Sequence, residues 1–362
     1  MHGGNIWALA RERSLHPAQV LDFSADLNPM GPPAEVRTLL EEGLKVLAHY
    51  PDPDYRQFCE SAAQAEGLDP PCILPGNGTA DLIHLIGRWK AGEPVGVAAP
   101  TFTEYQQASA ANSSATRFLP LREDFGFQPD PDEMLALLKE VRLFYLCNPN
   151  NPTGILWPAP LLRNLLEEAG WSGTTVVIDE AYMDFVAYPD RFSAAQWVET
   201  FPNLIVLRSL TKILALPGLR IGYLAASPAV RKGLNALQPP WALNGLAAWV
   251  GKEWIGKEAY EVFVQQTREK VKLFRAEFAT GLAGFSELQA FPSAANFFLC
   301  RLAPGHSASD LARRLAGQGV LIRMCDDFTG LEPGRFVRLA VRTSQENQRF
   351  LRLLQEIFAH VG

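Results

Sequence analysis

A lysine, two small hydroxyls and an arginine follow one apolar run near the middle of the sequence. Lys212 comes soon after the apolar run 204–207, with Ser209 and Thr211 beside it and Arg220 beyond a Pro-Gly turn. Hydroxyl and guanidinium groups are good donors to a phosphate dianion. A lysine amine held beside such a site is placed to form an imine with an aldehyde. The alternative is a surface lysine whose aliphatic stem lies on apolar neighbours.

A strand-end aspartate could complete a site for a cofactor with both an aldehyde and a phosphate. Pyridoxal 5'-phosphate carries both groups, and its pyridine nitrogen must stay protonated to accept electrons from a carbanion. Asp179 ends the apolar run "VVID", and a carboxylate there favours the protonated nitrogen. A helix N-cap is its alternative role. Tyr182 follows within the same segment and could hydrogen-bond the phenolic oxygen of the ring. We therefore expect pyridoxal phosphate as the cofactor.

Two further loops suit the same cofactor. "CNPNNPTG" at 147–154 forces a tight loop after a predicted strand, and Asn151 could donate to the ring oxygen or serve the turn alone. "LPGNGTADLIHLI" at 74–86 is typical of a Gly-rich turn that opens a helix. The backbone N–H groups of Gly78, Thr79 and Ala80 would then face a phosphate. Neither a Walker A nor a GxGxxG pattern is present, so nucleotide binding is the weaker interpretation.

An aromatic side chain could cover the face of the cofactor ring. "APTFTEY" at 99–105 offers Phe102 and Tyr105, either of which could stack on the ring or belong to the core. Its position favours Tyr105.

Apolar runs and helical patterns alternate through the first two thirds of the chain. This spacing predicts a mostly parallel sheet covered on both faces. The candidate strands are 94–100, 142–149, 174–182, 203–210 and 220–227, with helices between them such as 130–141 and 159–170.

The pattern changes after about residue 240. A long helical stretch covers 244–283, and short strands with two more helices follow at 296–302, 308–318, 320–325, 336–341 and 344–361. We expect a large cofactor-binding domain over 41–240 and a small α+β domain over 241–362. The segment 1–40 is expected to be an arm that joins the small domain and covers the site.

Composition excludes several classes of protein. The 362 residues carry a formal net charge of −6, which does not indicate a nucleic-acid surface. Five cysteines, an odd number without a CxxC pair, favour free thiols in a reducing cytosol. The N-terminus has no apolar signal core, and no run approaches the roughly 18 apolar residues of a membrane span. We expect a cytoplasmic enzyme with no metal site and no contact with a membrane or nucleic acid.

Motifs spread in order over most of the chain carry a family resemblance. They are Gly-Asn-Gly at 76–78, Asn-Pro-Thr-Gly at 151–154, Asp179 with Tyr182, and Ser209-x-x-Lys212 with Arg220. Together they resemble the fold-type I pyridoxal phosphate enzymes, and among these the class I/II aminotransferase-like group. The resemblance implies an α/β fold with a large, mostly parallel seven-stranded sheet domain and a smaller α+β domain.

The resemblance also implies a role for each matching residue. Lys212 would hold the coenzyme aldehyde, Asp179 would face the pyridine nitrogen, and Asn151 and Tyr182 would contact O3. The residues implied for the coenzyme phosphate are Gly78, Thr79, Ser209 and Arg220.

The family's active sites lie between the two subunits of a homodimer. Tyr50 in "HYPDPDY" matches the tyrosine that reaches the partner's coenzyme phosphate. Packing within its Pro-rich turn is the alternative.

Arginines in the small domain are candidates for binding the substrate. Arg338 and Arg342 stand at i and i+4 on a predicted strand, hence on one face. Arg338 matches the α-carboxylate clamp of the family, and a planar fork suits a carboxylate. Arg323 is a second strand arginine, and such a residue is costly to bury without an anion. One could be a structural ion pair; several together indicate a substrate with more than one anionic group.

Two segments near the N-terminus resemble one subgroup of this family. "MHGGNIW" and "DFSADLNP" resemble the threonine-phosphate decarboxylases of cobalamin synthesis, where His2, Gly3, Gly4 and Asn28 would cover a substrate phosphate. Glycine permits close backbone approach, and His and Asn donate hydrogen bonds; a disordered terminus is the alternative. Asp26 stands where that subfamily has asparagine.

Other activities stay open. Histidinol-phosphate aminotransferases resemble the sequence next best, and serine phosphate differs from threonine phosphate by one methyl, worth about 1–3 kcal/mol. A coenzyme-binding regulator would need a DNA-binding module, for which the chain has no spare length. A nicotinamide dehydrogenase would need the fingerprint glycines.

Overall fold

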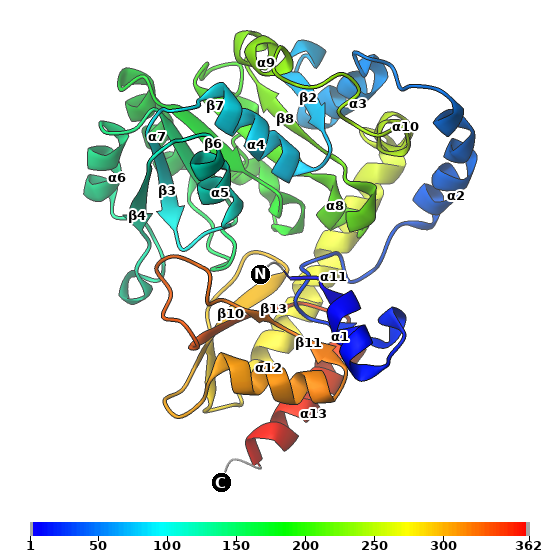
Figure 1. Cartoon of the computed structure of the whole chain (residues 1–362), viewed down its shortest axis with the longest axis vertical. Helices are drawn as coiled ribbons and strands as arrows, with labels where there is room; N and C mark the ends of the chain where they lie inside the picture. Colours follow the sequence, from blue (N-terminus) through cyan, green and yellow to red (C-terminus); the bar gives the residue numbers. More distant parts are fainter. Residues whose placement is uncertain (1–2, 360–362) are drawn as a thin grey trace.

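A seven-stranded sheet forms the centre of the larger part of the molecule (Figure 1). The computed structural model describes residues 3–359. The strand order is β2-β8-β7-β6-β5-β3-β4, and only β8 runs antiparallel to its neighbours. The strands are β2 (Ile73–Gly76), β3 (Val95–Ala99), β4 (Thr116–Pro120), β5 (Leu143–Cys147), β6 (Thr175–Asp179), β7 (Leu204–Ser209) and β8 (Gly222–Ala226). The mostly parallel sheet predicted from the sequence is confirmed.

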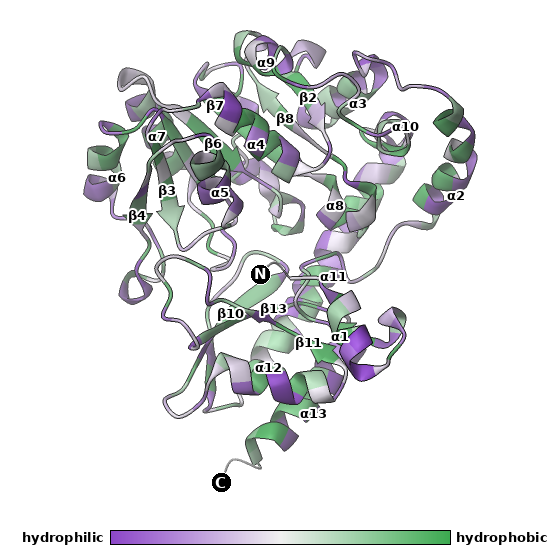
Figure 2. Ribbon diagram, viewed as in Figure 1, coloured by the Kyte–Doolittle hydropathy of each residue, from purple (hydrophilic) through white to green (hydrophobic). Residues whose placement is uncertain are grey.

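Helices bury this sheet on both faces. Every residue of β3, β5, β6 and β8 is buried, which is why their sequences are continuous apolar runs without alternation. In Figure 2 the labelled strands β3 and β8 are drawn in the green of hydrophobic residues. The helices that pack on the sheet or beside it are α3 (Arg56–Glu66), α4 (Thr79–Trp89), α5 (Glu104–Ala111), α6 (Pro131–Leu138), α7 (Ala159–Trp171), α8 (Leu210–Ile213) and α9 (Pro228–Asn235).

The smaller part of the molecule contains two small sheets. An antiparallel sheet has the order β12-β13-β10-β9, and a parallel pair joins β1 to β11. Their bounds are β1 (Leu21–Asp22), β9 (Leu288–Ala290), β10 (Phe297–Leu302), β11 (Val320–Leu321), β12 (Arg323–Met324) and β13 (Phe336–Ala340), flanked by α1 (Ile6–Arg13), α12 (Ala308–Gly317) and α13 (Ser344–Ala359). The single strand expected over 320–325 is thus divided, because its two halves pair with different sheets.

The helical stretch expected over 244–283 is two helices. α10 (Gly245–Trp254) ends before Gly256, whose φ of +69° lies in the left-handed region, and α11 (Glu258–Leu282) begins after it. α10 packs on α3 and on α2 (Ala34–Gly43). α11 runs from beside α10 into the smaller part of the molecule (Figure 1).

The N-terminal segment contributes to both parts. Phe23, just after β1, is fully buried and stacks within 4.3 Å of Phe350 of α13, inside the smaller core. α2 then packs beside the larger sheet domain. The residue limits of the two domains stay a prediction. Over residues 3–359, no helix is both long and apolar enough to cross a membrane.

Candidate active site

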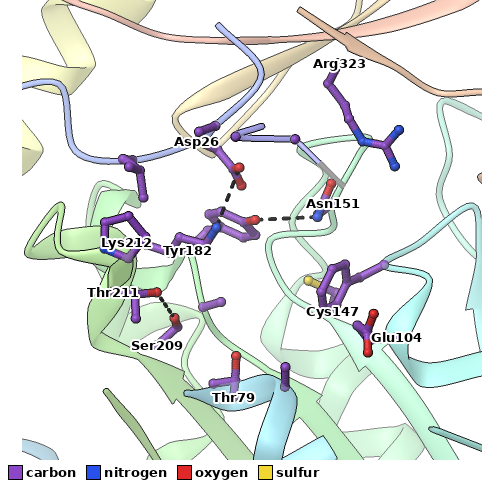
Figure 3. A pocket seen from close by; sticks show the side chains of 18 of the residues that line it. Asp26, Thr79, Glu104, Cys147, Asn151, Tyr182, Ser209, Thr211, Lys212 and Arg323 are labelled. Atoms are coloured by element: carbon purple, nitrogen blue, oxygen red, sulfur yellow. Dashed lines mark hydrogen bonds and ion pairs between the residues drawn. The ribbon is translucent and has the colours of Figure 1, made fainter. Parts of the chain in front are cut away.

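A cavity of about 450 Å3 opens at the carboxyl ends of the parallel strands (Figure 3). Cys147, Asp179 and Ser209 line it from the ends of β5, β6 and β7. This edge is where open α/β sheets bind ligands. The N-terminal segment and the small antiparallel sheet contribute the opposite wall, through Gly3 and Arg338 among others.

Lys212 projects into this cavity from α8. Its Nζ lies 3.6 Å from Asp26 Oδ1 and 5.7 Å above the ring of Tyr182. The backbone around the lysine is held by Asn28, whose N–H donates to the Lys212 carbonyl at 3.0 Å and whose Nδ2 donates to the Ile213 carbonyl at 2.8 Å. Asn28 is buried and is not among the cavity-lining residues. The direct substrate contact expected of Asn28 stays a prediction, and in this structure its amide fixes the lysine loop.

Asp179 offers a buried carboxylate to whatever fills the cavity. Its Oδ2 accepts a hydrogen bond from the Tyr105 hydroxyl at 2.8 Å, and its Oδ1 accepts one from the Ala181 N–H at 3.0 Å. Burial raises the pKa of Asp179 to about 6, although both hydrogen bonds and the Lys212 charge oppose that rise. Removing this carboxylate from water is unfavourable unless a cation faces it. A protonated pyridine ring would be such a cation.

The phosphate end predicted for the coenzyme is assembled from three segments. Thr79 and Ala80, at the N-terminus of α4, line the cavity together with Ser209 and Arg220. Gly78 has φ +83°, and a Cβ at this position would overlap the Arg220 guanidinium. The glycine thus lies behind the arginine and leaves room for it. Helix N–H groups, hydroxyls and a guanidinium together suit a phosphate.

Thr211 belongs to this group although sequence reasoning did not assign it a binding role. Its Oγ1 lies 2.9 Å from Ser209 Oγ, and it also lines the cavity. The sequence feature that could have identified Thr211 is its position between Ser209 and Lys212.

Asn151 and Tyr182 are adjacent, as their shared predicted role requires. Asn151 Nδ2 lies 3.5 Å from the Tyr182 hydroxyl, and Asn151 Oδ1 accepts a hydrogen bond of 2.6 Å from Arg338 Nη1. Tyr105 is fully buried with its ring stacked on Tyr145 at 4.9 Å, and it also reaches the cavity. Phe102, the alternative, lines the cavity too.

The two predicted substrate arginines both reach the cavity. Arg338 is almost fully buried, and its Nη2 donates to the Ser24 carbonyl and to Asp26 Oδ1, each at 2.8 Å. Arg323 pairs with Asp327 through two bonds of 2.7 and 2.9 Å. Arg342 does not join them: β13 ends before it, and its guanidinium pairs with Glu346 at 3.0 Å.

The glycines of the N-terminal segment lie against the "DFS" turn. The Gly4 N–H donates to Ser24 Oγ at 2.7 Å, and a Cβ on Gly3 would overlap the Ser24 carbonyl. Both glycines line the cavity. The prediction for His2 falls outside the described residues.

Asp26 is the site residue that sequence reasoning left without a role. Burial acts to raise the pKa of its carboxyl, but the Arg338 and Lys212 charges lower it to about 2. Glu104, whose Oε2 lies 3.1 Å from His84 Nε2, also lines the cavity and was not anticipated.

Tyr50 lies away from this cavity. Its side chain is 78% exposed and stacks on Trp241 with ring centroids 4.4 Å apart. Its predicted reach into a partner's active site stays a prediction.

The fold and this cavity define a fold-type I pyridoxal phosphate enzyme. The arrangement fits the coenzyme because it combines an amine, a buried carboxylate in need of a cation, and a cradle of anion donors. The chain belongs to the aminotransferase class I and II family, whose sequence model matches residues 18–354.

Named relatives include both decarboxylases and aminotransferases. The chain is 34% identical to the threonine-phosphate decarboxylase of Salmonella typhimurium, over 100% of this chain and 97% of that protein. The solved L-threonine-O-3-phosphate decarboxylase of Porphyromonas gingivalis aligns with TM-score 0.83 and 28% identity, covering 94% of this chain and 100% of the other. The solved histidinol-phosphate aminotransferase of Clostridium acetobutylicum gives TM-score 0.87 and 28% identity, with coverage of 93% and 99%.

Proposed function

We propose that this protein is a cytoplasmic, pyridoxal phosphate-dependent decarboxylase. Its substrate would be L-threonine O-3-phosphate, and its product (R)-1-amino-2-propanol O-2-phosphate for cobalamin synthesis. The observation that carries the proposal is that Arg323 and Arg338 line the same cavity as Lys212 and Asp179. Two arginines suit a substrate with two anionic groups, as an amino-acid phosphate has. The decarboxylase named among the full-length relatives supports the reaction type.

The coenzyme end of the cavity has one task for each group. Lys212 holds the aldehyde, Asp179 keeps the pyridine nitrogen protonated, and Asn151 with Tyr182 hydrogen-bonds O3. The phosphate is bound by Thr79, Ser209 and Arg220. Gly78 leaves room for the arginine, and Tyr105 covers the ring face. When bound, the coenzyme accepts the electron pair left at Cα after a bond there breaks.

The substrate end decides which bond breaks. The reaction would depend on which Cα bond the protein aligns for electron transfer to the coenzyme, and a decarboxylase would have to align the bond to the carboxylate. Arg338, Arg323, Gly3 and Gly4 all line the cavity, and they would orient the carboxylate. The Lys212 amine or a nearby water would return a proton to Cα.

We also propose a homodimer in which Tyr50 binds the partner's coenzyme phosphate. A second cavity of about 580 Å3 surrounds Tyr50 and includes Trp249. Leu44 and Leu47, close by in the sequence, are 60% and 55% exposed. Large apolar side chains exposed within one segment are typical of a surface that another protein covers. Sedimentation at increasing concentration tests the assembly.

Assays with separate substrates test the activity. We expect the holoenzyme to release CO2 from L-threonine O-3-phosphate, more slowly from L-serine O-phosphate, and to form no glutamate from histidinol phosphate with 2-oxoglutarate. Lys212→Arg keeps the charge but loses the covalent link, so CO2 release should stop. The matched control, Lys232→Arg, changes an exposed lysine of α9 and should keep it. Absence of CO2 from threonine phosphate would defeat the proposal.

Histidinol-phosphate aminotransferase is the second candidate. It is favoured by the TM-score of 0.87 to a solved enzyme of that name. Glutamate formation in the third assay would establish it in place of the decarboxylase.

A further inference from the structure

Asp26 places a carboxylate of this chain on the arginine expected to bind the substrate. Its side chain is 4% exposed, and its Oδ1 lies 2.8 Å from Arg338 Nη2 and 3.6 Å from Lys212 Nζ. Figure 3 shows it above Tyr182, pointing towards the lysine. Arg338 therefore has its charge balanced before any substrate arrives.

The other titratable groups around Asp26 do not supply a competing charge. Tyr182, after β6, and Cys147, at the end of β5, interact with it electrostatically, and burial raises the pKa of each well above its usual range. They are therefore neutral at ordinary pH. Arg338 from β13 and Lys212 from α8 remain as the two cations that face the carboxylate.

Two more titratable groups act on the Arg338 side of the pair. Asp22 of β1 raises the pKa of Arg338, as Asp26 does, although burial opposes both. Asp22 Oδ1 accepts hydrogen bonds from the N–H and the hydroxyl of Ser24, at 2.8 and 2.6 Å. Cys325, whose own pKa burial raises, also interacts with Arg338. The arginine thus already faces at least one ionised partner in direct contact.

An incoming carboxylate or phosphate meets a pair whose two side chains are only 5% and 4% exposed. Asp26 Oδ2 is buried and accepts no hydrogen bond from the described residues. Two anions that share one buried cation repel each other, and one of them then takes a proton more readily. Asp26 is ionised in the free site, so it is the group whose protonation state binding can change.

We propose that Asp26 is a specificity-determining residue that competes with the substrate's anionic group for Arg338, so that docking is accompanied by uptake of a proton by the Asp26 carboxyl. The proton comes from the solvent and returns to it when the ligand leaves. The inference rests on the proposed function only in requiring an anionic group of the substrate at Arg338. Ligands with one anionic group fewer avoid this competition, so Asp26 disfavours the more highly charged ligand as pH rises.

The proposed proton uptake sets how strongly the dissociation constant of the ligand depends on pH. If one proton is taken up per site, the dissociation constant rises about tenfold for each pH unit above the pKa of the free Asp26 carboxyl, until the carboxyl stays ionised in the complex too. Asp26→Asn keeps the side-chain volume, cannot ionise, and can donate a hydrogen bond to an anion. Near pH 8 the variant should bind the doubly anionic ligand more tightly than the wild type, by about tenfold for each unit by which docking raises the pKa of the Asp26 carboxyl.

Calorimetry on the holoenzyme tests this without turnover. 3-Phosphoglycerate carries a carboxylate and a phosphate but no amine, so it cannot react with the aldehyde held by Lys212; glycerol 3-phosphate lacks the carboxylate. Titrations near pH 8, where phosphate with a second pKa of about 6 is already a dianion, are run in two buffers of different ionisation enthalpy. The difference in heat gives the number of protons taken up.

The expected results separate the charge from the surrounding structure. The wild-type protein should take up protons with 3-phosphoglycerate, in a fraction set by how far docking raises the pKa of Asp26, and Asp26→Asn should take up none. Ser24→Ala is the matched control, because it alters the same segment but keeps the backbone carbonyl that binds Arg338; its proton uptake should persist. No proton uptake by the wild type would overturn the inference, whatever the variants do. So would unchanged uptake in Asp26→Asn.

These readouts are independent of the decarboxylation assay. If threonine phosphate is not decarboxylated but proton uptake depends on Asp26, the proposed function fails and this inference stands. If CO2 is released but the wild type takes up no proton, the proposed function stands and this inference fails.

Discussion

Replacing Asp179 by asparagine should stabilise the coenzyme-free protein and weaken its binding of coenzyme. Asp179 is 3% exposed and lines the cavity, and Lys212 is the one cation that lowers its pKa. An asparagine can still accept the Ala181 hydrogen bond at its Oδ1, and its Nδ2 can donate to the hydroxyl oxygen of Tyr105. What it removes is the cost of burying a negative charge, together with the charge that attracts the pyridine nitrogen.

The magnitude follows from the pKa of the carboxyl. Folding raises it from 3.8 to about 6, a change of about 2 units, which corresponds to roughly 3 kcal/mol. The sign is set by the folded protein binding the proton more tightly than the unfolded chain. The free energy of unfolding therefore falls as pH rises from 3.8 through about 6, and the full loss persists at higher pH. The variant, which has no such proton, should not show this fall.

Urea denaturation of coenzyme-free protein measures the effect. Near pH 8 we expect Asp179→Asn to exceed the wild type by up to about 3 kcal/mol, and near pH 5 by clearly less. Added coenzyme should stabilise the wild type by mass action but the variant far less. Glu346→Gln is the contrasting control: although burial opposes them, the Arg342 charge and the Thr343 hydrogen bonds hold the pKa of this carboxyl below its usual value, so the loss of its charge should destabilise. A coenzyme-free Asp179→Asn protein that is less stable than wild type near pH 8 would refute the reasoning.

Three further changes have defined outcomes. Gly78→Ala should raise the dissociation constant of the coenzyme at least about tenfold in an absorbance titration, because the new methyl displaces the Arg220 guanidinium; unchanged affinity would contradict this. Arg208→Met should lower the free energy of unfolding, measured in urea, by about 3–5 kcal/mol, because three carboxylates lose their cation. A change in that free energy no larger than the experimental error would contradict this. Tyr50→Phe keeps the ring that stacks on Trp241 and should weaken coenzyme binding only in a dimer; equal affinity in a proven dimer would exclude the proposed contact.

The residues that end buried strands could be placed from the sequence. Asp179 and Ser209 each follow a continuous apolar run, and parallel strands buried on both faces bring their carboxyl ends to one edge. Their meeting in one cavity follows from local pattern and sheet geometry. The break before α11 was missed because hydrophobic periodicity continues across it, although Gly256 was the residue able to adopt the left-handed turn.

Contacts between distant segments could not be placed in the same way. Asp26 and Arg338 are 312 positions apart, and nothing local to either residue states that they touch. Asn28 was predicted to face the substrate because its type donates hydrogen bonds, yet its amide is taken up by the backbone after Lys212. Residue type restricts what a side chain can bind, but tertiary packing decides which partner is within reach.

The strand ends that carry the site also carry a second, structural network. Side chains alternate across a strand, so Ser209 lines the cavity while Arg208 points to a buried cluster and bonds Glu66 at 2.8 Å and Glu180 at 3.4 Å. Glu180 in turn directly follows Asp179, the cavity residue of β6. Each of the two strand ends is thus fixed by an ion pair on the side away from the coenzyme. A carboxylate aimed at a ring nitrogen tolerates little displacement, and this network holds it without adding charge to the cavity.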